Sequence, residues 1–481
     1  MHFSIPDTED FRDENGAAYT GYNLHVNGVF HCTVRYSQLF DFQEQVKKEY
    51  GTAFLGPHKF PPKKLLSLSP PQIDERRLKL EKYVQILSQD SRIANSDLFN
   101  GFLLSAQKET RKEDPTEVQL NVYLMNGHKI TVDIMSTDQT DDCLEAVAAE
   151  VGLPDDFVYY FALFLMKREN DDDKGTIVRR IQDFESPFIS MKAATGKHKI
   201  VLRKKYWDSA YDDELVDDRV ALQLLYVQIV SDVERGWVEG TKEQLSRLEA
   251  LKAKGSKKEY LKFARTLKFY GFIQFKSCKT DYPADNTPVM VCAGNKELIF
   301  RVAMQDGSCK EGVFRITRMR CWRITTVSHE NNTSENEHDL ELAFEYLVAK
   351  NKLQWITIAS EQAILMSLCL QDMVDELVMK KKGARIKRPQ DRIKGPQRIF
   401  KGRDGGVITA SSSSTPVASP DPPSSPLTSP TEESPSKAFK GMESVKRISD
   451  KLQSVSVNSK SKGPGATVEN DIFEGIGEDD L

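Results

Sequence analysis

Five residues suited to binding a phosphorylated sugar alcohol lie within the stretch 34–83. They provide three separated cations, one aromatic ring and one hydroxyl group: Arg35, Tyr36, Ser37, Lys63 and Arg76. Fixed cations pair with phosphate groups, and a hydroxyl at the start of a helix lies beside backbone N–H groups that also favour an anion. An aromatic face can support the ring of the sugar. These residue types and their spacing therefore predict a site for an inositol phosphate headgroup.

The sequence on either side of Arg35 predicts the elements that hold this site. Apolar and polar residues alternate before and after Asn27-Gly28, a strong signal for a β-hairpin because both turn residues need a positive φ. After Tyr36 the apolar residues recur at helical spacing, with Ser37 as the expected N-cap. Arg35 should thus end a strand, while Tyr36 and Ser37 open a helix.

The remaining cations follow a pair of prolines. Pro61-Pro62 predicts an extended, polyproline-like segment that delivers the lysine after it. The leucines in 65–68 lie in a proline-bounded loop beside lysines, where they either pack in the core or enter a bilayer, and the sequence favours neither. A helix expected from about Ile73 carries two adjacent arginines, Arg76 and Arg77.

Taken in order, the strand-end Arg-Tyr-Ser, the Pro-Pro-x-Lys-like segment and the helical arginine resemble the PX (phox homology) domain of sorting nexins. In that family these positions bind phosphatidylinositol 3-phosphate. The resemblance implies that Arg35 pairs with the 3-phosphate and that Tyr36 stacks under the inositol ring. It also implies that Ser37 caps the helix and touches a phosphate. Lys63 would reach the 1-phosphate, and Arg76 would hold the 4- and 5-hydroxyls.

A single arginine or lysine is usually a solvated surface charge, but five matches in the family's order argue against that interpretation. Of the two adjacent arginines, the spacing to Tyr83 favours Arg76 over Arg77. We therefore expect residues 1–110 to form a PX domain that binds phosphoinositides.

Length and composition describe an ordinary globular chain. With 481 residues and a formal net charge of −4, it is long enough for roughly three domains and gives no sign of binding nucleic acid. Its seven cysteines are scattered and never form a Cys-x-x-Cys pair, which favours a reducing, cytosolic setting and argues against a structural zinc site. The longest apolar run, 157–166, falls short of the roughly 20 residues of a membrane-spanning helix. No Arg-rich or apolar leader opens the chain, so we expect no signal peptide.

Sequence motifs for catalysis are not found. There is no phosphate-binding P-loop, no His-Glu-x-x-His pair and no nucleophile elbow, and the eight histidines are dispersed. The Gly-x-Gly at 475–477 follows no strand, so it is not a dinucleotide loop. We therefore expect a binding protein and not an enzyme, with no cofactor and no metal ion.

Three further units follow the first domain. Residues 116–206 combine a hairpin at Asn126-Gly127, a crossing helix and further strands, which predict a ubiquitin-like β-grasp lobe. Residues 207–270 have helical periodicity, and residues 271–388 predict seven short strands closed by a long helix, the plan of a PTB- or PH-like sandwich. This order resembles a FERM module. The expected fold class is α+β multidomain: a PX domain, a FERM-like module and a disordered C-terminal tail.

A PX domain followed by a FERM-like module resembles one small group of sorting nexins. Because nothing precedes the PX domain, the member of the group with a PDZ domain is disfavoured. In this group the sandwich binds Asn-Pro-x-Tyr or Asn-x-x-Tyr motifs in receptor tails, of the LDL-receptor, integrin β and amyloid precursor protein types. Such a peptide extends the edge of a sheet, and pockets beside the last helix read its side chains.

The matching edge in this chain is 319–324. The resemblance implies that Trp322 forms the aromatic wall of the peptide site and that Val374 of the long helix faces it. Arg320 and Cys321 are weaker neighbours. Core packing is the alternative role for Trp322, and it is a strong alternative for Val374, since a valine in an amphipathic helix usually faces the core.

Composition changes near the end of the sandwich. Basic residues in 380–403 are opposed only by Asp391, and this run either continues the helix, forms a solvated arm or binds an anionic leaflet. A Ser/Pro-rich stretch follows at 411–436, so we expect residues 389–470 to be a disordered basic and Ser/Pro-rich linker.

The last residues, 471–481, form an acidic tail with apolar anchors and a free carboxylate, a combination that partner pockets can capture. The segment closely resembles the tail by which a member of this sorting nexin group engages the Retriever recycling complex. The resemblance implies Leu481 and its carboxylate as the essential anchor. Its expected supports are Phe473, Ile476, Asp479 and Asp480.

These inferences combine into a cargo adaptor on the cytosolic face of early endosomes. It would bind phosphatidylinositol 3-phosphate, hold receptor tails and direct them to recycling instead of lysosomal degradation. Contacts that are weak one by one would retain the protein through avidity. Two alternatives remain: a cortical FERM scaffold, or an effector of Ras-type GTPases that acts through the β-grasp lobe.

Overall fold

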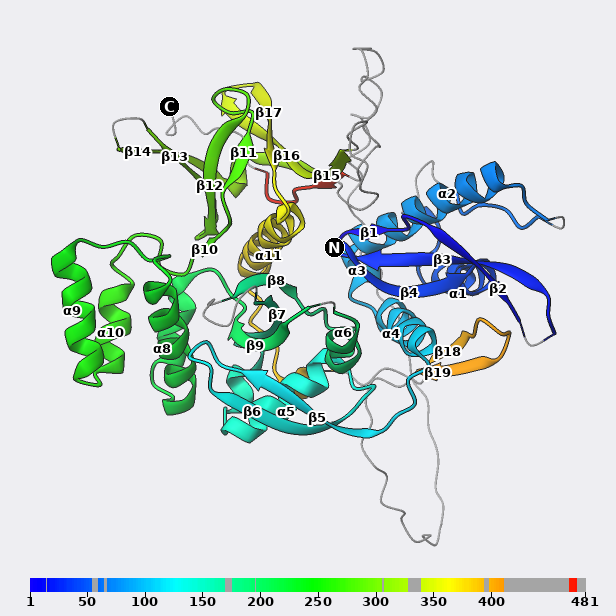
Figure 1. The fold of residues 1–481 in the computed structure, drawn as a ribbon, viewed down its shortest axis with the longest axis horizontal. Helices are drawn as coiled ribbons and strands as arrows, with labels where there is room; N and C mark the ends of the chain where they lie inside the picture. Colours follow the sequence, from blue (N-terminus) through cyan, green and yellow to red (C-terminus); the bar gives the residue numbers. More distant parts are fainter. Residues whose placement is uncertain are drawn as a thin grey trace, which may run out of the picture. The chain divides into compact units, whose positions relative to one another are not determined.

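The computed structural model describes residues 1–13, 15–53, 59–64, 67–168, 175–194, 196–304, 307–327, 339–392, 398–410 and 467–473 (Figure 1). Its buried apolar residues form separate clusters: one in the N-terminal domain, one shared by the β-grasp and helical lobes, and one in the C-terminal sandwich. Among the described residues, no helix is long and apolar enough to cross a membrane.

The N-terminal domain is an antiparallel sheet packed against helices. Strand β3 is central, and it pairs with β1, β2 and β4. The hairpin β3–β4 turns at Asn27 and Gly28, which both have positive φ, as expected. The elements are β1 (Phe3–Ser4), β2 (Thr8–Arg12), β3 (Ala18–Val26), β4 (Val29–Arg35), α1 (Tyr36–Tyr50), α2 (Pro70–Gln89), α3 (Ser91–Ala94) and α4 (Asp97–Arg111).

The start of α1 differs from the sequence prediction. The N-cap is Arg35, whose backbone N–H donates to the Oε1 of Gln38 at 2.8 Å. Because the side chain of Gln38, in the first turn, accepts from the N–H of Arg35, the helix begins at Tyr36. Ser37 therefore lies inside the first turn instead of capping it. Arg35 nevertheless ends strand β4, as predicted.

Helix α2 also begins earlier than the expected start near Ile73. It starts at Pro70, because proline lacks only an N–H that would be unpaired in the first turn, and its fixed φ suits a helix. The leucines Leu65 and Leu66, for which two roles were considered, lie outside the described residues.

Residues 117–204 form the expected β-grasp lobe. Its five-stranded sheet has the order β6-β5-β9-β7-β8, with β5 and β9 parallel, and α5 packs on it. Small helices of the next lobe share the same apolar cluster. The elements are β5 (Glu117–Tyr123), β6 (Lys129–Met135), α5 (Thr140–Val151), η2 (Asp155–Tyr160), β7 (Phe161–Lys167), β8 (Thr176–Arg180), α6 (Pro187–Ala193), β9 (His198–Lys204), η3 (Ser209–Tyr211), α7 (Asp212–Leu215), α8 (Arg219–Glu234), α9 (Lys242–Ala253) and α10 (Lys257–Ala264).

The C-terminal lobe is a strand-rich sandwich closed by one long helix. Its described strands form a nine-stranded sheet in the order β14-β13-β12-β11-β17-β16-β15-β20, with β10 paired to β12. The edge strand β20 comes from the C-terminal tail. The elements are β10 (Ile273–Gln274), β11 (Cys278–Thr280), β12 (Thr287–Gly294), β13 (Glu297–Ala303), β14 (Cys309–Arg315), η4 (Ile316–Arg318), β15 (Met319–Val327), β16 (Asp339–Ala349), β17 (Lys352–Ala359), α11 (Ala363–Lys381) and β20 (Thr467–Glu469).

Part of the expected disordered linker, 389–470, is ordered. Beyond α11 the chain forms η5 (Pro389–Asp391) and a hairpin of β18 (Arg398–Lys401) and β19 (Val407–Ala410), besides β20. The hairpin packs on α1 and α4 of the N-terminal domain (Figure 1). Its basic residues had masked the apolar strand pattern of Phe400 and Ile408, which are cross-strand partners.

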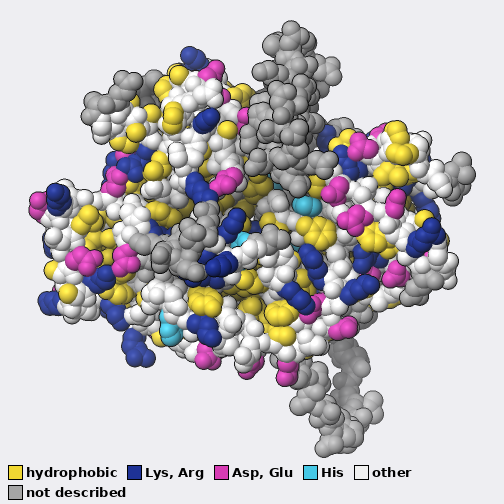
Figure 2. Space-filling model, viewed as in Figure 1, with side chains coloured by type: hydrophobic (Ala, Val, Ile, Leu, Met, Phe, Trp, Pro, Cys, Tyr) yellow, Lys and Arg dark blue, Asp and Glu magenta, His cyan; other side chains and the backbone are white. Residues whose placement is uncertain are grey.

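The basic run from Lys380 is largely paired within the chain, which none of the three sequence alternatives anticipated. Its cations meet carboxylates of the preceding lobes and of the N-terminal domain. The pairs are Lys380–Asp208 (2.5 Å), Arg388–Asp156 (2.8 Å), Arg392–Asp142 (2.7 Å) and Arg398–Glu49 (2.7 Å). On the face drawn in Figure 2, basic and acidic side chains are likewise interspersed.

Candidate functional sites

The structure brings together three parts of the site predicted around Tyr36. The hydroxyl of Tyr36 donates to the carbonyl of Pro61 at 2.8 Å, which ties the start of α1 to the proline segment. The guanidinium carbon of Arg76 lies 4.3 Å from the centre of the Tyr36 ring, a cation–π contact. Lys63 leaves the same proline segment and is exposed. An aromatic ring with one guanidinium against it, and an exposed lysine on the segment bonded to its hydroxyl, suits a phosphorylated sugar ring.

The two adjacent arginines of α2 point to different neighbours. Arg76 approaches Tyr36 and the carbonyl of Pro62, at 3.4 Å. Arg77 instead pairs with Asp74 at 2.8 Å and donates to the carbonyl of Ile5 at 2.5 Å. The geometry therefore favours Arg76 for the site, in agreement with the spacing argument, and gives Arg77 a structural contact.

Arg35 is held by groups that the sequence analysis did not connect with it. Its guanidinium carbon lies 4.2 Å from the ring centre of Tyr19, and its Nη1 lies 3.8 Å from a carboxylate oxygen of Asp13. The same Nη1 donates to the backbone carbonyl of Arg403 at 3.1 Å. The side chain remains 27% exposed, so it is accessible from solvent.

Aromatic rings form a wall behind Tyr36. Phe60 lies 5.7 Å and Phe40 6.1 Å from Tyr36 between ring centres. Burial raises the pKa of Tyr36 and keeps the phenol neutral, while the nearby Arg76 acts in the opposite direction. Sequence reasoning missed Phe60, although it directly precedes the proline pair that was singled out.

The predicted peptide edge, β15, is already paired on both sides. Strand β16 lies on one side, and β20 of the C-terminal tail lies antiparallel on the other. The register places Cys321 opposite Glu469, Trp322 opposite Val468 and Arg323 opposite Thr467. The tail thus extends this sheet in the way that a bound peptide would.

Asn470 fixes the tail beyond β20. Its backbone N–H donates to the carbonyl of Arg320 at 3.0 Å, and its side-chain amide donates to the carbonyls of Ile316 and Met319 at 2.8 and 2.6 Å. The N–H of Phe473 donates back to the carbonyl of Asn470 at 3.1 Å, closing a turn. The segment Asn470-Asp471-Ile472-Phe473 therefore has the Asn-x-x-aromatic spacing of the expected ligand motif.

Apolar side chains of the tail join the core of the sandwich. Val468 and Ile472 are buried in the same cluster as Trp322 and Val374. Trp322 is 1% exposed, and its indole N–H donates to the hydroxyl of Ser367 on α11 at 2.9 Å. The two residues expected to line the peptide site thus lie in one apolar cluster with the tail segment.

The weaker neighbours contact the strand behind them. The guanidinium of Arg320 pairs closely with Glu345 of β16, and the thiol of Cys321 lies 3.8 Å from the same carboxylate. Burial raises the pKa of Cys321 to about 11, so this thiol is neutral at physiological pH. Of the predicted tail anchors, Phe473 is partly buried, and the others lie outside the described residues: Ile476, Asp479, Asp480 and Leu481.

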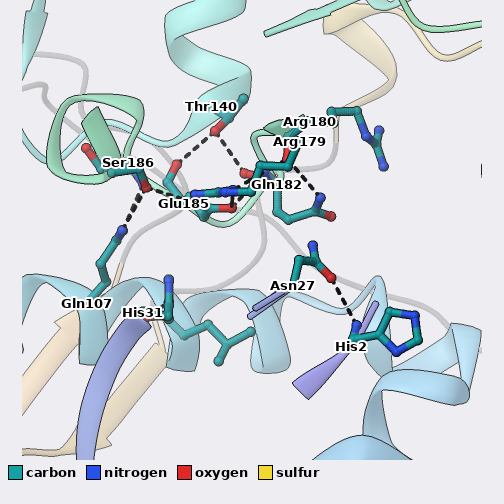
Figure 3. A network of polar contacts seen from close by, with 12 residues as sticks. His2, Asn27, His31, Gln107, Thr140, Arg179, Arg180, Gln182, Glu185 and Ser186 are labelled. Carbon is teal, nitrogen blue, oxygen red and sulfur yellow. Dashed lines mark hydrogen bonds and ion pairs between the residues drawn. The ribbon is translucent and has the colours of Figure 1, made fainter. Parts of the chain in front are cut away.

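A polar network joins the N-terminal domain to the β-grasp lobe (Figure 3). Gln107 of α4 accepts from the N–H of Ser186 at 2.9 Å and donates to Ser190 at 3.1 Å. Beside it, Arg179 and Glu185 form a buried ion pair at 2.5 Å. Burial would raise the pKa of Glu185, but the charge and hydrogen bonds of Arg179, together with His31 and the hydroxyl of Ser190, hold this pKa below its usual value.

A second contact joins the N-terminal domain to the sandwich. The backbone N–H of His2 donates to the side chain of Asn27 at 3.0 Å, as Figure 3 shows. The His2 Nε2 lies 2.6 Å from the hydroxyl of Ser367, the group that accepts from Trp322. Burial lowers the pKa of His2 to about 3, so the imidazole is neutral.

Comparison with known families agrees with this order of domains. The PX domain profile matches residues 22–106, and the sorting nexin 17/27/31 FERM F1 lobe profile matches 118–207. The sorting nexin 17/31 FERM F2 lobe profile matches 208–268, and the sorting nexin 17 FERM C-terminal domain profile matches 271–378. The fold is therefore that of a PX–FERM protein, and the expected fold class is confirmed.

Curated relatives narrow the family further. Sorting nexin-17 of Danio rerio is 47% identical to this chain over 100% of both chains, and that of Homo sapiens is 46% identical over the same extent. Sorting nexin-31 of Homo sapiens is 34% identical over 79% of this chain and 86% of its own. The chain belongs to the sorting nexins, in the PX–FERM group that contains sorting nexins 17 and 31. The resemblance inferred from sequence is thus confirmed.

Proposed function

We propose that this chain is a cargo adaptor that sorts membrane receptors at endosomes. The domains that it shares with its relatives are binding modules, and a PX domain suggests peripheral attachment to a phosphoinositide-bearing membrane. In this proposal it works on the cytosolic face of early endosomes. It binds phosphatidylinositol 3-phosphate at one end and a receptor tail at the other.

The lipid site of this proposal consists of Arg35, Tyr36, Ser37, Lys63 and Arg76. Support comes from the ring of Tyr36, which has the guanidinium of Arg76 over it, and from the exposed Lys63 nearby. Arg35 would pair with the 3-phosphate, since a guanidinium can bind a phosphate through two parallel N–H groups. The sugar ring would then replace solvent beside Tyr36.

The peptide site of this proposal is the outer edge of β15, and one observation carries it. The chain's own segment 467–473 lies on this edge, with an Asn-x-x-Phe turn held by Asn470. An Asn-Pro-x-Tyr or Asn-x-x-Tyr motif of a receptor tail has the same spacing of asparagine and aromatic ring. It would take the place of the segment and extend the sheet beside Trp322, with Val374, Arg320 and Cys321 around it.

The C-terminal tail would then have two roles in turn. While segment 467–473 lies on β15, Phe473 is partly buried, and Asn470 is bonded to the sandwich. When cargo displaces it, Phe473, Ile476, Asp479, Asp480 and Leu481 would be available to the Retriever complex, which directs the cargo to recycling. Cargo capture and delivery would thereby be linked through one surface.

Calorimetry with an Asn-Pro-x-Tyr peptide tests the peptide site directly on the full chain. Asn470→Ala removes the three hydrogen bonds of the Asn470 side chain, to the carbonyls of Ile316 and Met319 and from the N–H of Ile472. This weakens the tail's hold on β15 and is expected to raise peptide affinity roughly tenfold. Asp471→Ala is the matched control, because Asp471 is exposed in the same turn. Equal affinities of the Asn470→Ala and control variants would place the peptide site elsewhere. A phosphotyrosine peptide in the same titration shows whether phosphorylation of the tyrosine strengthens binding.

A further inference from the structure

The hairpin β18–β19 is built into the N-terminal domain although it comes from the far side of the FERM module. Phe400 is 2% exposed and belongs to that domain's apolar cluster, with its ring 5.9 Å from that of Phe102. Gln38 and Gln45 of α1 donate to carbonyls of β18, both at 3.1 Å. The hairpin is therefore fixed along α1, the helix that begins at the proposed lipid site.

The tip of the hairpin reaches Arg35. The carbonyl of Arg403 accepts from Arg35 at 3.1 Å, and the backbone N–H of Arg403 donates to Glu109 at 2.6 Å. The guanidinium carbon of Arg403 lies 5.5 Å from the ring centre of Phe11, which stacks on Tyr19, the ring under Arg35. The tip of the hairpin and Arg35, the residue proposed to bind the 3-phosphate, thus belong to one cluster of contacts.

The outward side of the hairpin carries aliphatic and basic groups together. Cross-strand pairing sets Lys401 opposite Val407, and alternation turns both away from the side on which Phe400 is buried. Lys401 is exposed, Val407 is 72% exposed, and Ile399, two residues from Lys401 along β18, is 59% exposed. Val407 and Ile399 are the two most exposed of the large apolar side chains among the described residues.

This combination suits the surface of an anionic bilayer. Basic side chains are attracted to anionic lipid, and adjacent aliphatic side chains gain by leaving water at the boundary of headgroups and acyl chains. The position decides between a bilayer and a protein partner. Lys401 and Val407 flank the tip that bonds to Arg35, so a membrane whose headgroup reaches Arg35 lies next to them.

We propose that the outward side of the β18–β19 hairpin, Lys401 with Val407, is a second membrane-contact surface beside the phosphoinositide site, and that its partner is an anionic bilayer. The proposal rests on the lipid site of the proposed function. The headgroup gives the specificity, and the hairpin adds affinity for the surrounding lipid. Lipid binding then depends on a segment that lies beyond the FERM module in the sequence.

Vesicle sedimentation on the full chain tests this surface. The vesicles contain phosphatidylcholine, phosphatidylserine and phosphatidylinositol 3-phosphate, and soluble inositol 1,3-bisphosphate is titrated in parallel. Lys401→Glu with Val407→Ser is expected to weaken vesicle binding on the order of tenfold, because charge attraction and apolar contact are both lost. Binding of the soluble headgroup should stay within about twofold of the unaltered chain, a ratio worth roughly 0.4 kcal/mol.

A matched control exists on α9 of the helical lobe. Lys242 and Leu245 are likewise an exposed lysine and an exposed aliphatic residue, and Lys242→Glu with Leu245→Ser should leave vesicle binding unchanged. Unchanged vesicle affinity of the hairpin variant would overturn the proposal. Equal loss of vesicle and soluble headgroup binding would also overturn it, since the hairpin would then act on the pocket alone. If Arg35→Ala leaves both vesicle binding and soluble headgroup binding intact, the proposed lipid site itself is refuted. That result is distinguishable from the two results that would overturn the hairpin proposal.

Discussion

The proposed lipid site and the proposed peptide site are completed in different ways. At the lipid site, residues of one domain meet a hairpin that supports Arg35 from the side, while Lys63 and part of Arg35 remain in contact with solvent. At the peptide site, a segment of the chain itself lies on β15 with the spacing of a ligand. One site is supported by a distant segment, and the other is covered by one. The difference predicts that mutations in the two distant segments act in opposite directions: those in the hairpin should weaken lipid binding, and those in the tail should strengthen peptide binding.

The largest expected effect is at the lipid site. Arg35→Ala with Lys63→Ala removes two charged contacts, each worth about 1.5–3 kcal/mol, so affinity for phosphatidylinositol 3-phosphate vesicles should fall by more than roughly a hundredfold. Affinity for an Asn-Pro-x-Tyr peptide should not change, because the peptide edge lies in another lobe. Sedimentation and calorimetry on the same preparation measure both. Lys79→Ala, at an exposed lysine of α2, is the control. Intact vesicle binding in the double variant would refute the lipid assignment.

The support given by the hairpin can be broken at Phe400. Phe400→Ala removes a ring that is buried in the N-terminal domain, and such truncations cost about 3–5 kcal/mol of stability. Thermal unfolding, monitored by calorimetry, should show a lower transition temperature for the variant than for the unaltered chain. Ile399→Ala, at the exposed neighbour in the same strand, should stay within about 0.5 kcal/mol of the unaltered chain. Equal stability of the two variants would mean that the hairpin detaches in solution.

The parts of the proposed lipid site that are close to one another in sequence could be placed on their elements from the sequence alone. Arg35 at a strand end, Tyr36 at a helix start and Arg76 on the next helix follow from local periodicity and spacing. The prediction for Ser37 was wrong because the helix begins before it: Arg35 is the N-cap, and the side chain of Gln38 accepts from the N–H of Arg35. Local capping signals of this kind are ambiguous by one or two positions.

The contacts between residues far apart in sequence could not be predicted in this way. Arg35 and Arg403 are 368 positions apart, and no local pattern states that they meet. Yet signals for both segments existed: Phe400 and Ile408 flank a Gly-Gly turn, and Asn470-Asp471-Ile472-Phe473 has the motif spacing expected of cargo. Basic and Ser/Pro-rich composition concealed them, because such composition is typical of linkers. A pair of apolar residues on either side of a glycine turn can therefore indicate a β-hairpin even inside a charged run.

The smallest effect is expected at Ser367, where the two regions meet. Its hydroxyl accepts from the indole of Trp322 and lies against the imidazole of His2, so Ser367→Ala leaves both groups without this partner. A buried donor that loses its partner costs about 1–3 kcal/mol of stability. Because the indole of Trp322 then lacks the bond that fixes its position, peptide binding should weaken roughly fivefold. His2→Ala keeps the contact between Ser367 and Trp322 and should change peptide affinity less. Calorimetry with the same peptide ranks the two variants. If Ser367→Ala binds peptide normally and unfolds at the usual temperature, packing alone holds Trp322, and the N-terminal domain does not influence the peptide edge.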